Sequence, residues 1–164
     1  MIQEGSDLWK YLSPSQQALA HDGAFLVADS DRHLDTALTD YSYLVFPFAK
    51  LYEGFLKQLL LDLGIMTEKE YRSDHYRVGK TLSPSLVGRL GHKSAFGEIE
   101  RRIGGDLAIQ LWQTWKNGRN LVFHYFPHNY RALTHEGAKE IIDSIVTIME
   151  RAIEETNVHR QTLG

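Results

Sequence analysis

The sequence predicts an all-α protein, on three observations. Apolar residues recur at helical spacing along most of the chain, while strand signals are sparse apart from residues 23–27. Serine and threonine stand directly before several of these stretches, as helix N-caps do. The 164 residues are 43% hydrophobic, which is enough to bury the core of one domain. We therefore predict a single helical bundle over residues 1–164, in which residues 1–30 form an N-terminal helical extension.

Two helices are expected in the first part of the chain. Ser13 is a good N-cap and Pro14 suits the first helical position, so a helix should run from there to about Ala28. A second and much longer helix should begin after Asp31, because its apolar pattern continues as far as Leu63.

Proline and glycine then shape the long helix and the segment after it. Pro47 lacks a backbone N–H and should kink the long helix or split it in two. Gly64 is a helix stop. Residues 65–94 carry several turn signals and should form short helical pieces, beginning at residues 67–70.

Two further helices are expected in the second part of the chain. Ser94 caps a helix over residues 95–115, in which Gly104 and Gly105 form a weak point. Thr134 caps a last helix that reaches about Glu155. Its apolar stripe comprises Ile141, Ile142, Ile145, Val146, Ile148 and Met149.

Composition excludes several classes of function. The chain has no cysteine, which rules out disulfides, zinc-thiolate sites and thiol chemistry and fits a reducing cytoplasm. No apolar run reaches the roughly 18 residues that cross a bilayer. The first residues lack the basic start and apolar stretch of a signal peptide. We expect a cytoplasmic protein that does not bind membranes.

The net charge of −3 argues against non-specific coating of nucleic acid. Contact with RNA would need a local basic patch, and basic residues do cluster in the second half of the chain. The alternative is that they are ordinary solvated surface charges. The cluster comprises Arg89, His92, Lys93, Arg101, Arg102, Lys116, Arg119 and Arg131. The candidates for RNA contact are Lys116, Arg102 and the aromatic Tyr125, although packing is an alternative role for the aromatic residues near it.

The most informative segment is residues 117–125, because it combines an arginine, an asparagine and a histidine. Asn117 and Gly118 predict a helix stop, and a short helix should follow over residues 120–125. Asn120 and His124 are four residues apart and would share one face of that helix. Arg119 lies five residues before His124, about 140° around a regular helix. The helix stop would let the long side chain of Arg119 swing towards the imidazole.

These residue types suit metal-independent cleavage of RNA by its own 2′-hydroxyl. That reaction needs a base, an acid and a cation or donor that stabilises the phosphorane. His124 would serve as base or acid, Arg119 would hold the phosphate, and Asn120 would orient the phosphate or the imidazole. Since one chain supplies one such histidine, a two-fold homodimer would complete the site. The alternative is a structural histidine, with Arg119 in a salt bridge.

Glu53 lies on an apolar stripe of the long helix and therefore needs a partner. That stripe comprises Phe46, Ala49, Leu56 and Leu60. Glu53 either pairs with Lys50 or Lys57 at helical spacing, or it points at Arg119 or His124 and holds it in position.

A metal site is the weaker alternative. His124, His128 and His135, with Glu136 and Asp106, have the right donor atoms. However, Pro127 separates the first two histidines, and no two-histidine helix motif is present. We expect no metal and no cofactor.

Trp112 and Trp115 stand at the spacing of core residues, so we expect them to pack in the core and not to stack on bases.

Arg119-Asn120, followed by three residues and His124, resembles the signature of the HEPN superfamily, a group of small all-α domains that includes metal-independent ribonucleases. The chain is most similar to the dimerising C-terminal domain of RnlA/LsoA-type toxins, in which a phrase like residues 47–57 lies on a long helix. The resemblance covers roughly residues 35–155.

The resemblance implies a HEPN-like bundle and an endoribonuclease of toxin or anti-phage systems, with an antitoxin or defence protein as a possible partner. Arg119 and His124 would be catalytic, Asn120 would assist, and Glu53 would organise them at a two-fold interface. The products would be a 2′,3′-cyclic phosphate and a 5′-hydroxyl.

The sequence departs from the family pattern in one respect. Some HEPN toxins carry a tyrosine two places after the histidine, where a partner enzyme modifies it, whereas this chain has Phe126. The alternatives to an enzyme are a HEPN-like module that binds RNA, nucleotide or a protein without catalysis, and a structural helical adaptor.

Overall fold

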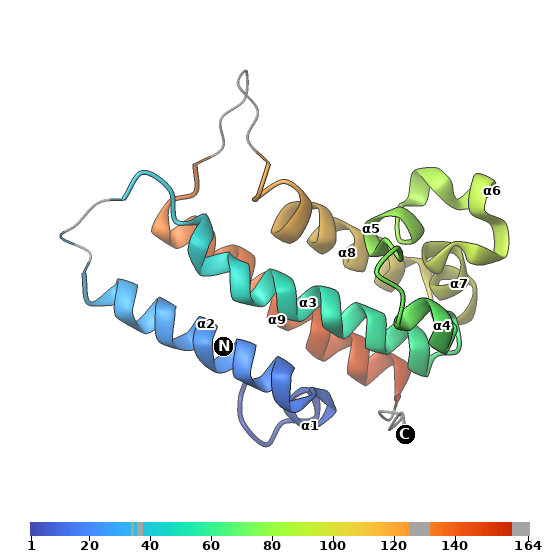
Figure 1. Cartoon of the computed structure of the whole chain (residues 1–164), viewed down its shortest axis with the longest axis horizontal. Coiled ribbons are helices and arrows are strands. Elements are labelled where there is room, and N and C mark those ends of the chain that lie inside the picture. The colour runs from blue at the N-terminus through green and yellow to red at the C-terminus, as the bar shows by residue number, and fades with distance from the viewer. Residues whose placement is uncertain (34, 36–37, 125–131, 159–164) are drawn as a thin grey trace.

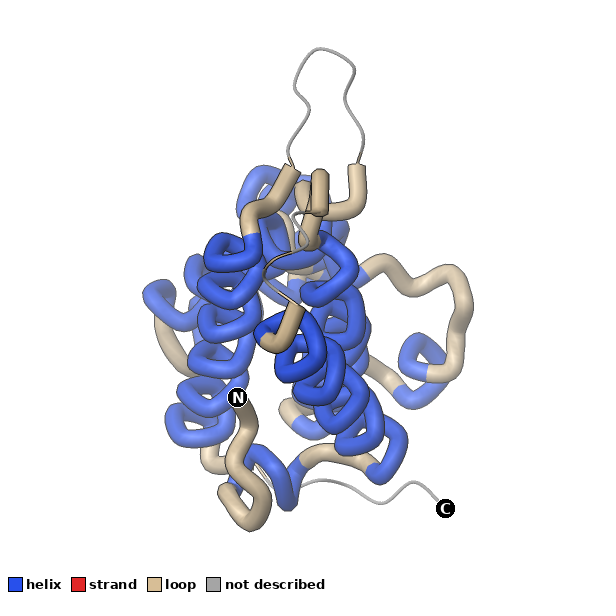
Figure 2. The backbone as a smooth tube through the Cα atoms, turned by 90° about the vertical axis from the view of Figure 1, so that its left-hand side faces the viewer, coloured by secondary structure: helices blue, strands red, loops and turns tan. Residues whose placement is uncertain are grey.

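The computed structural model describes residues 1–33, 35, 38–124 and 132–158, and every regular element in these ranges is helical (Figure 1, Figure 2). The prediction of an all-α class is therefore confirmed. The strand signal at residues 23–27 was misleading, because that segment lies inside a helix. The elements are α1 (Asp7–Tyr11), α2 (Pro14–Asp31), α3 (Ser42–Asp62), α4 (Glu68–Tyr71), α5 (Val78–Thr81), η1 (Pro84–Leu86), α6 (Val87–Leu90), η2 (Gly91–Lys93), α7 (Ala95–Arg102), α8 (Gly105–Trp115), η3 (Lys116–Asn120) and α9 (His135–Thr156).

Helix α3 is the centre of the bundle. It packs against α2 and α9, and α8 lies along its other side (Figure 1). Its fully buried side chains are Leu44, Val45, Phe48, Leu51, Tyr52, Phe55, Leu56, Leu59 and Leu60. Full burial of one such side chain contributes about 1.5 to 3 kcal/mol, so this helix dominates the hydrophobic core. The N-terminal segment adds Leu8, Tyr11, Ala20 and Val27 to the same core.

Local capping explains where α2 and α3 begin. Ser13 accepts a hydrogen bond from the backbone N–H of Gln16, and the Gln16 side chain accepts one from Ser13 in return, which makes a capping box. The long helix starts at Ser42 and not directly after Asp31, as the sequence pattern had indicated. The N-cap residue Tyr41 makes no side-chain cap bond, and the carboxylate of Asp40 accepts the backbone N–H of Ser42 at the helix start.

Pro47 does not split α3, which is continuous from Ser42 to Asp62. The proline lies in the second turn, and its neighbour Phe48 is fully buried. Burial of the surrounding side chains outweighs the missing N–H, so tertiary packing overrides the local break signal.

The second part of the chain follows its capping signals. Thr67, Ser94 and Thr134 each accept a backbone hydrogen bond at the start of a helix. The expected weak point at Gly104 and Gly105 is a break between α7 and α8. None of the helices in the described ranges has the length and apolarity that crossing a bilayer requires.

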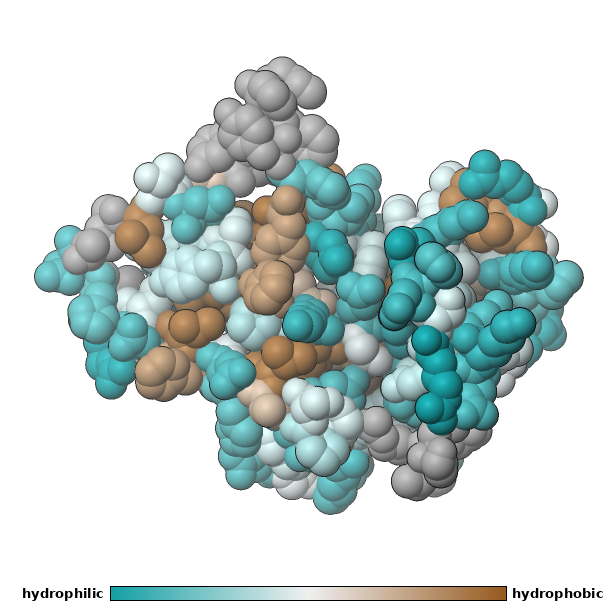
Figure 3. All heavy atoms as spheres, in the orientation of Figure 1, coloured by the Kyte–Doolittle hydropathy of each residue, from teal (hydrophilic) through white to brown (hydrophobic). Residues whose placement is uncertain are grey.

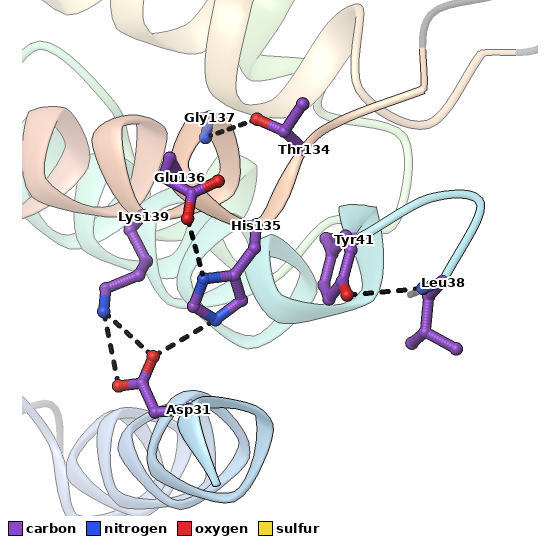
Figure 4. Close-up of polar contacts among 8 residues, drawn as sticks. All are labelled: Asp31, Leu38, Tyr41, Thr134, His135, Glu136, Gly137 and Lys139. Carbon is purple, nitrogen blue, oxygen red and sulfur yellow. Dashed lines mark hydrogen bonds and ion pairs between the residues drawn. The ribbon is translucent and has the colours of Figure 1, made fainter. Parts of the chain in front are cut away.

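A polar cluster ties the end of α2 to the start of α9 (Figure 4). Asp31 contacts Lys139 at 3.0 Å and the buried His135 at 3.2 Å. The His135 contact has the distance of an ion pair without the alignment of a hydrogen bond. The other ring nitrogen of His135 faces Glu136, and its ring edge packs on Tyr41. Of the candidate metal ligands, His135 therefore helps to hold α2 and α9 together, and Glu136 faces the same imidazole from within α9.

Asp40 forms a second link at the same end of the bundle. It accepts hydrogen bonds from the N–H and the hydroxyl of Ser42 and from the N–H of Leu133, which precedes α9. The N–H of Tyr41 donates to the carbonyl of Leu133. Burial acts to raise the pKa of Asp40, but the bonds from Ser42 and Leu133 outweigh it and hold the pKa below its ordinary value.

Asp40→Ala should lower the free energy of unfolding at pH 7 by about 2 kcal/mol, because three donors lose their acceptor. A carboxylate with a lowered folded-state pKa contributes fully above its unfolded pKa of about 4, and the contribution is lost as the pH falls through the lowered value. In urea titrations, the difference between wild type and Asp40→Ala should therefore shrink below about pH 4. Asp22→Ala, at an exposed position of α2, is the control. A difference that stays constant as the solution is acidified would contradict an ionised role for Asp40.

Candidate functional site

The site is built on η3, the π-helical turn Lys116–Asn120 that continues from α8. The sequence predicted an α-helix that ends at about Trp115 and a stop at Asn117 and Gly118. The α-helix does end at Trp115, whereas the stop was wrong, because the chain continues through Asn117 and Gly118 as a π-helical turn. Gly118 is buried against α9, and a Cβ there would lie 3.0 Å from the Cδ1 of Ile145. The glycine therefore serves close packing of two helices, and the chain widens into a π turn, a feature that often marks functional sites.

Arg119 forms an ion pair with Glu53, 66 residues earlier on α3. Its Nε and Nη2 both lie 3.3 Å from the same carboxylate oxygen of Glu53. Of the two predicted alternatives for Glu53, the structure has the long-range partner and not the neighbouring lysines. The side chains are 40% and 31% exposed, so the pair adds at most about 1 kcal/mol to stability.

The ring of Trp115 supports Arg119 from another direction. The guanidinium carbon lies 5.6 Å from the ring centroid, within the range of a cation–π contact. Trp115 is buried, as its core spacing predicted, and a Cβ on Gly79 would overlap its indole nitrogen. Arg119 is thus held between a carboxylate and an aromatic ring. The sequence did not indicate that Gly79 supports the site. It could have indicated Trp115, because Trp115 lies four residues, about one helical turn, before Arg119.

Asn120 and His124 also meet. The Nε2 of His124 lies 3.2 Å from the side-chain oxygen of Asn120. Nε2 is the donor of this bond, because a side-chain amide oxygen can only accept. The predicted helix over residues 120–125 was wrong in its described part, because η3 ends at Asn120 and residues 121–123 form a turn.

An open pocket of about 330 Å³ adjoins the ion pair between Glu53 and Arg119. Its aromatic wall is formed by Phe46 and Phe123, whose rings make an edge-to-face contact with centroids 5.7 Å apart. In the view of Figure 3, apolar side chains reach the surface over α3 in the middle of the molecule. The remaining lining residues are Ala49 and Lys50. Helical periodicity placed Phe46 on the stripe of Glu53 but did not indicate that it would be exposed.

The predicted RNA-contact residues separate in the structure. Lys116 is exposed on η3, beside the site. Arg102 lies at the end of α7, where it donates to Glu98 and to the carbonyl of Leu63. That carbonyl is about 15 Å along α3 from Glu53, so Arg102 belongs to a different surface. Tyr125 lies outside the described residues.

The candidate metal ligands do not gather in the described part of the chain. No group of three or more His, Cys, Asp or Glu side chains there is placed to hold a metal ion. Asp106 forms an ion pair with Arg151 of α9. His128 lies outside the described residues.

No family model matches the chain, and the comparisons with curated proteins and with solved structures gave no match. Function is therefore inferred from the residues of the site and from the resemblance to HEPN domains.

Gly79→Ala tests the support beneath Arg119. The added methyl should displace the buried Trp115 ring, lower the free energy of unfolding by about 1 to 3 kcal/mol and shift the tryptophan fluorescence. Chemical denaturation and emission spectra of the folded protein measure both effects. Gly88→Ala is the control, because a Cβ there meets nothing within 4 Å. Equal stability of the two variants would contradict the close packing of Gly79 on Trp115.

Proposed function

We propose that the chain is a metal-independent endoribonuclease of the HEPN type, in whose reaction the 2′-hydroxyl of the RNA attacks the adjacent phosphate. The observation that carries the proposal is the contact of Glu53 with Arg119 across 66 residues of sequence. It brings a carboxylate of the central helix to η3, whose last residue, Asn120, hydrogen-bonds with His124. The resemblance to HEPN domains names these same four residues.

In the proposed reaction, the imidazole of one His124 removes the proton of the 2′-hydroxyl. The 2′-oxygen attacks the adjacent phosphorus, and the bond from phosphorus to the 5′-oxygen breaks. A protonated group gives its proton to the leaving oxygen, which yields a 2′,3′-cyclic phosphate and a 5′-hydroxyl. In a homodimer, the second copy of His124 would supply that proton.

Arg119 would stabilise the negative charge that develops on the phosphorane. Its contacts with Glu53 and Trp115 hold the guanidinium in place before the substrate arrives, so little reorganisation is needed. Asn120 would orient the imidazole through its side-chain oxygen. The role as a toxin or anti-phage effector, held in check by a partner protein, rests on the resemblance alone.

The second candidate function is a HEPN-like module that binds RNA, a nucleotide or a partner protein without catalysis. The net charge of −3 and the neutralisation of Arg119 by Glu53 favour it over a ribonuclease, because both lower the general attraction by which an enzyme would capture long RNA. Affinity would then come from the local site.

The proposal predicts cleavage of end-labelled RNA by purified protein in EDTA. Arg119→Ala and His124→Ala should each lower the rate about 100-fold or more, because each removes a group that acts on the transition state. Glu53→Gln should cause a smaller loss, about tenfold, since that side chain acts through Arg119. Gel electrophoresis and mass spectrometry of the products provide the measurement.

Two controls accompany this experiment. Lys57→Ala, on the same helix as Glu53, should keep wild-type activity, and an all-deoxy substrate should stay intact. Equal cleavage by wild type, Arg119→Ala and His124→Ala would refute the proposal. Salt-sensitive binding without any cleavage would favour the second candidate.

A further inference from the structure

The pocket beside the ion pair has two chemically different ends. Phe46, Ala49, Lys50 and Glu53 follow one face of α3 at spacings of three, four and seven residues. Phe46 and Glu53 are therefore about 10 Å apart along the helix axis. One end of the pocket is aromatic, and the other carries charged groups.

The aromatic end consists of rings that the core leaves uncovered. Phe46 is 55% exposed and Phe123 is 37% exposed, whereas the neighbouring Phe48 is fully buried. The interplanar angle between the two exposed rings is 83°. In such an edge-to-face pair, the ring that offers its edge keeps both faces clear of its partner. A flat ligand can stack on such a face.

The charged end selects for an anion. Two cations, Lys50 and Arg119, and one carboxylate, Glu53, line the pocket, which gives a local charge of +1 in a chain whose net charge is −3. Lys50 is exposed, and Arg119 keeps 40% of its side-chain surface open to solvent. A ligand that joins a flat ring to a negative charge complements both ends.

The volume of the pocket limits the size of the ligand. The volume of about 330 Å³ lies at the lower end of the range of about 300 to 1,000 Å³ for small-molecule pockets. Such a space admits one nucleobase, while a base inside a duplex cannot offer its face to a side chain. Stacking on aromatic rings beside cationic groups is how single strands are generally held.

We propose that this pocket binds one unpaired nucleobase of RNA, stacked on the face of one ring of the Phe46–Phe123 pair and in contact with the other ring, with an adjacent phosphate beside Lys50 and Arg119. The choice of RNA as the ligand rests on the proposed function. The site then prefers single-stranded RNA, and Phe46 and Phe123 position the strand without taking part in the chemistry.

Binding of a fluorescent single-stranded 2′-O-methyl RNA oligonucleotide tests this proposal, because the blocked 2′-oxygen prevents cleavage. Fluorescence anisotropy should show Phe46→Ala and Phe123→Ala binding at least about fivefold more weakly than wild type, the lower limit for loss of one stacked base. Phe46→Tyr keeps the ring and should bind like wild type. The matched control is Phe25→Ala, which removes a phenylalanine of α2 that is 64% exposed and does not line the pocket.

The same oligonucleotide in a perfect duplex should bind more weakly than the single strand, with no difference between wild type and Phe46→Ala. The proposal is overturned if Phe46→Ala binds the single strand as Phe25→Ala does. It is also overturned if, in sedimentation without RNA, Phe46→Ala converts a dimer to a monomer, because the aromatic pair would then belong to self-association.

Cleavage assays on unmodified RNA separate this proposal from the proposed function. Ring-dependent binding without any cleavage supports the base-binding pocket and refutes the ribonuclease. Cleavage with a KM that is the same in wild type and Phe46→Ala supports the ribonuclease and refutes the pocket.

Discussion

The burial of Tyr52 in the middle of α3 is the interaction on which the site geometry depends. Its ring is fully buried, and its hydroxyl donates a 3.0 Å hydrogen bond to the carbonyl of Leu111 on α8. Burial raises the pKa of Tyr52 well above its ordinary value, so the hydroxyl stays a donor at every physiological pH. The bond ties the middle of α3 to the second half of α8. The π-helical turn η3 continues from α8 and packs against α3, and this packing brings Arg119 to Glu53, the residue that follows Tyr52.

The ion pair of Glu53 and Arg119 is a consequence of this packing and not its cause. Both side chains are partly exposed, so their attraction is screened by water and contributes little to the stability of the fold. The hydrophobic burial of α3 contributes far more. The pair therefore sets the direction of the guanidinium at small cost to the fold, and Arg119 remains accessible to a ligand.

Signals that act within one turn could be predicted from the sequence. Ser13, Thr67, Ser94 and Thr134 each precede a helix and cap it, because a side-chain oxygen needs only a backbone N–H two or three residues away. Signals whose meaning depends on distant residues were misread. Gly118 resembled a stop, but it makes room for the side chains of α9.

The same limit applied to the site. A carboxylate on an apolar stripe indicated that Glu53 needed a partner, yet only the fold decides between a neighbouring lysine and Arg119. Periodicity also predicted which residues share a face of α3, but not how much of that face the neighbouring elements cover. Phe48 is covered and Phe46 is not, because coverage depends on where α2 and η3 lie in space.

The supports of Arg119 and His124 differ in kind. Arg119 lies on a turn packed between α3 and α9 and touches a buried indole ring, so its position follows from the core. His124 follows the turn at residues 121–123, is exposed, and hydrogen-bonds with Asn120. In the proposed reaction, Arg119 would stabilise developing charge from a position fixed by the core, and each copy of His124 would transfer one proton from an exposed position. A substitution in the core of α3 should therefore disturb Arg119 before it disturbs His124.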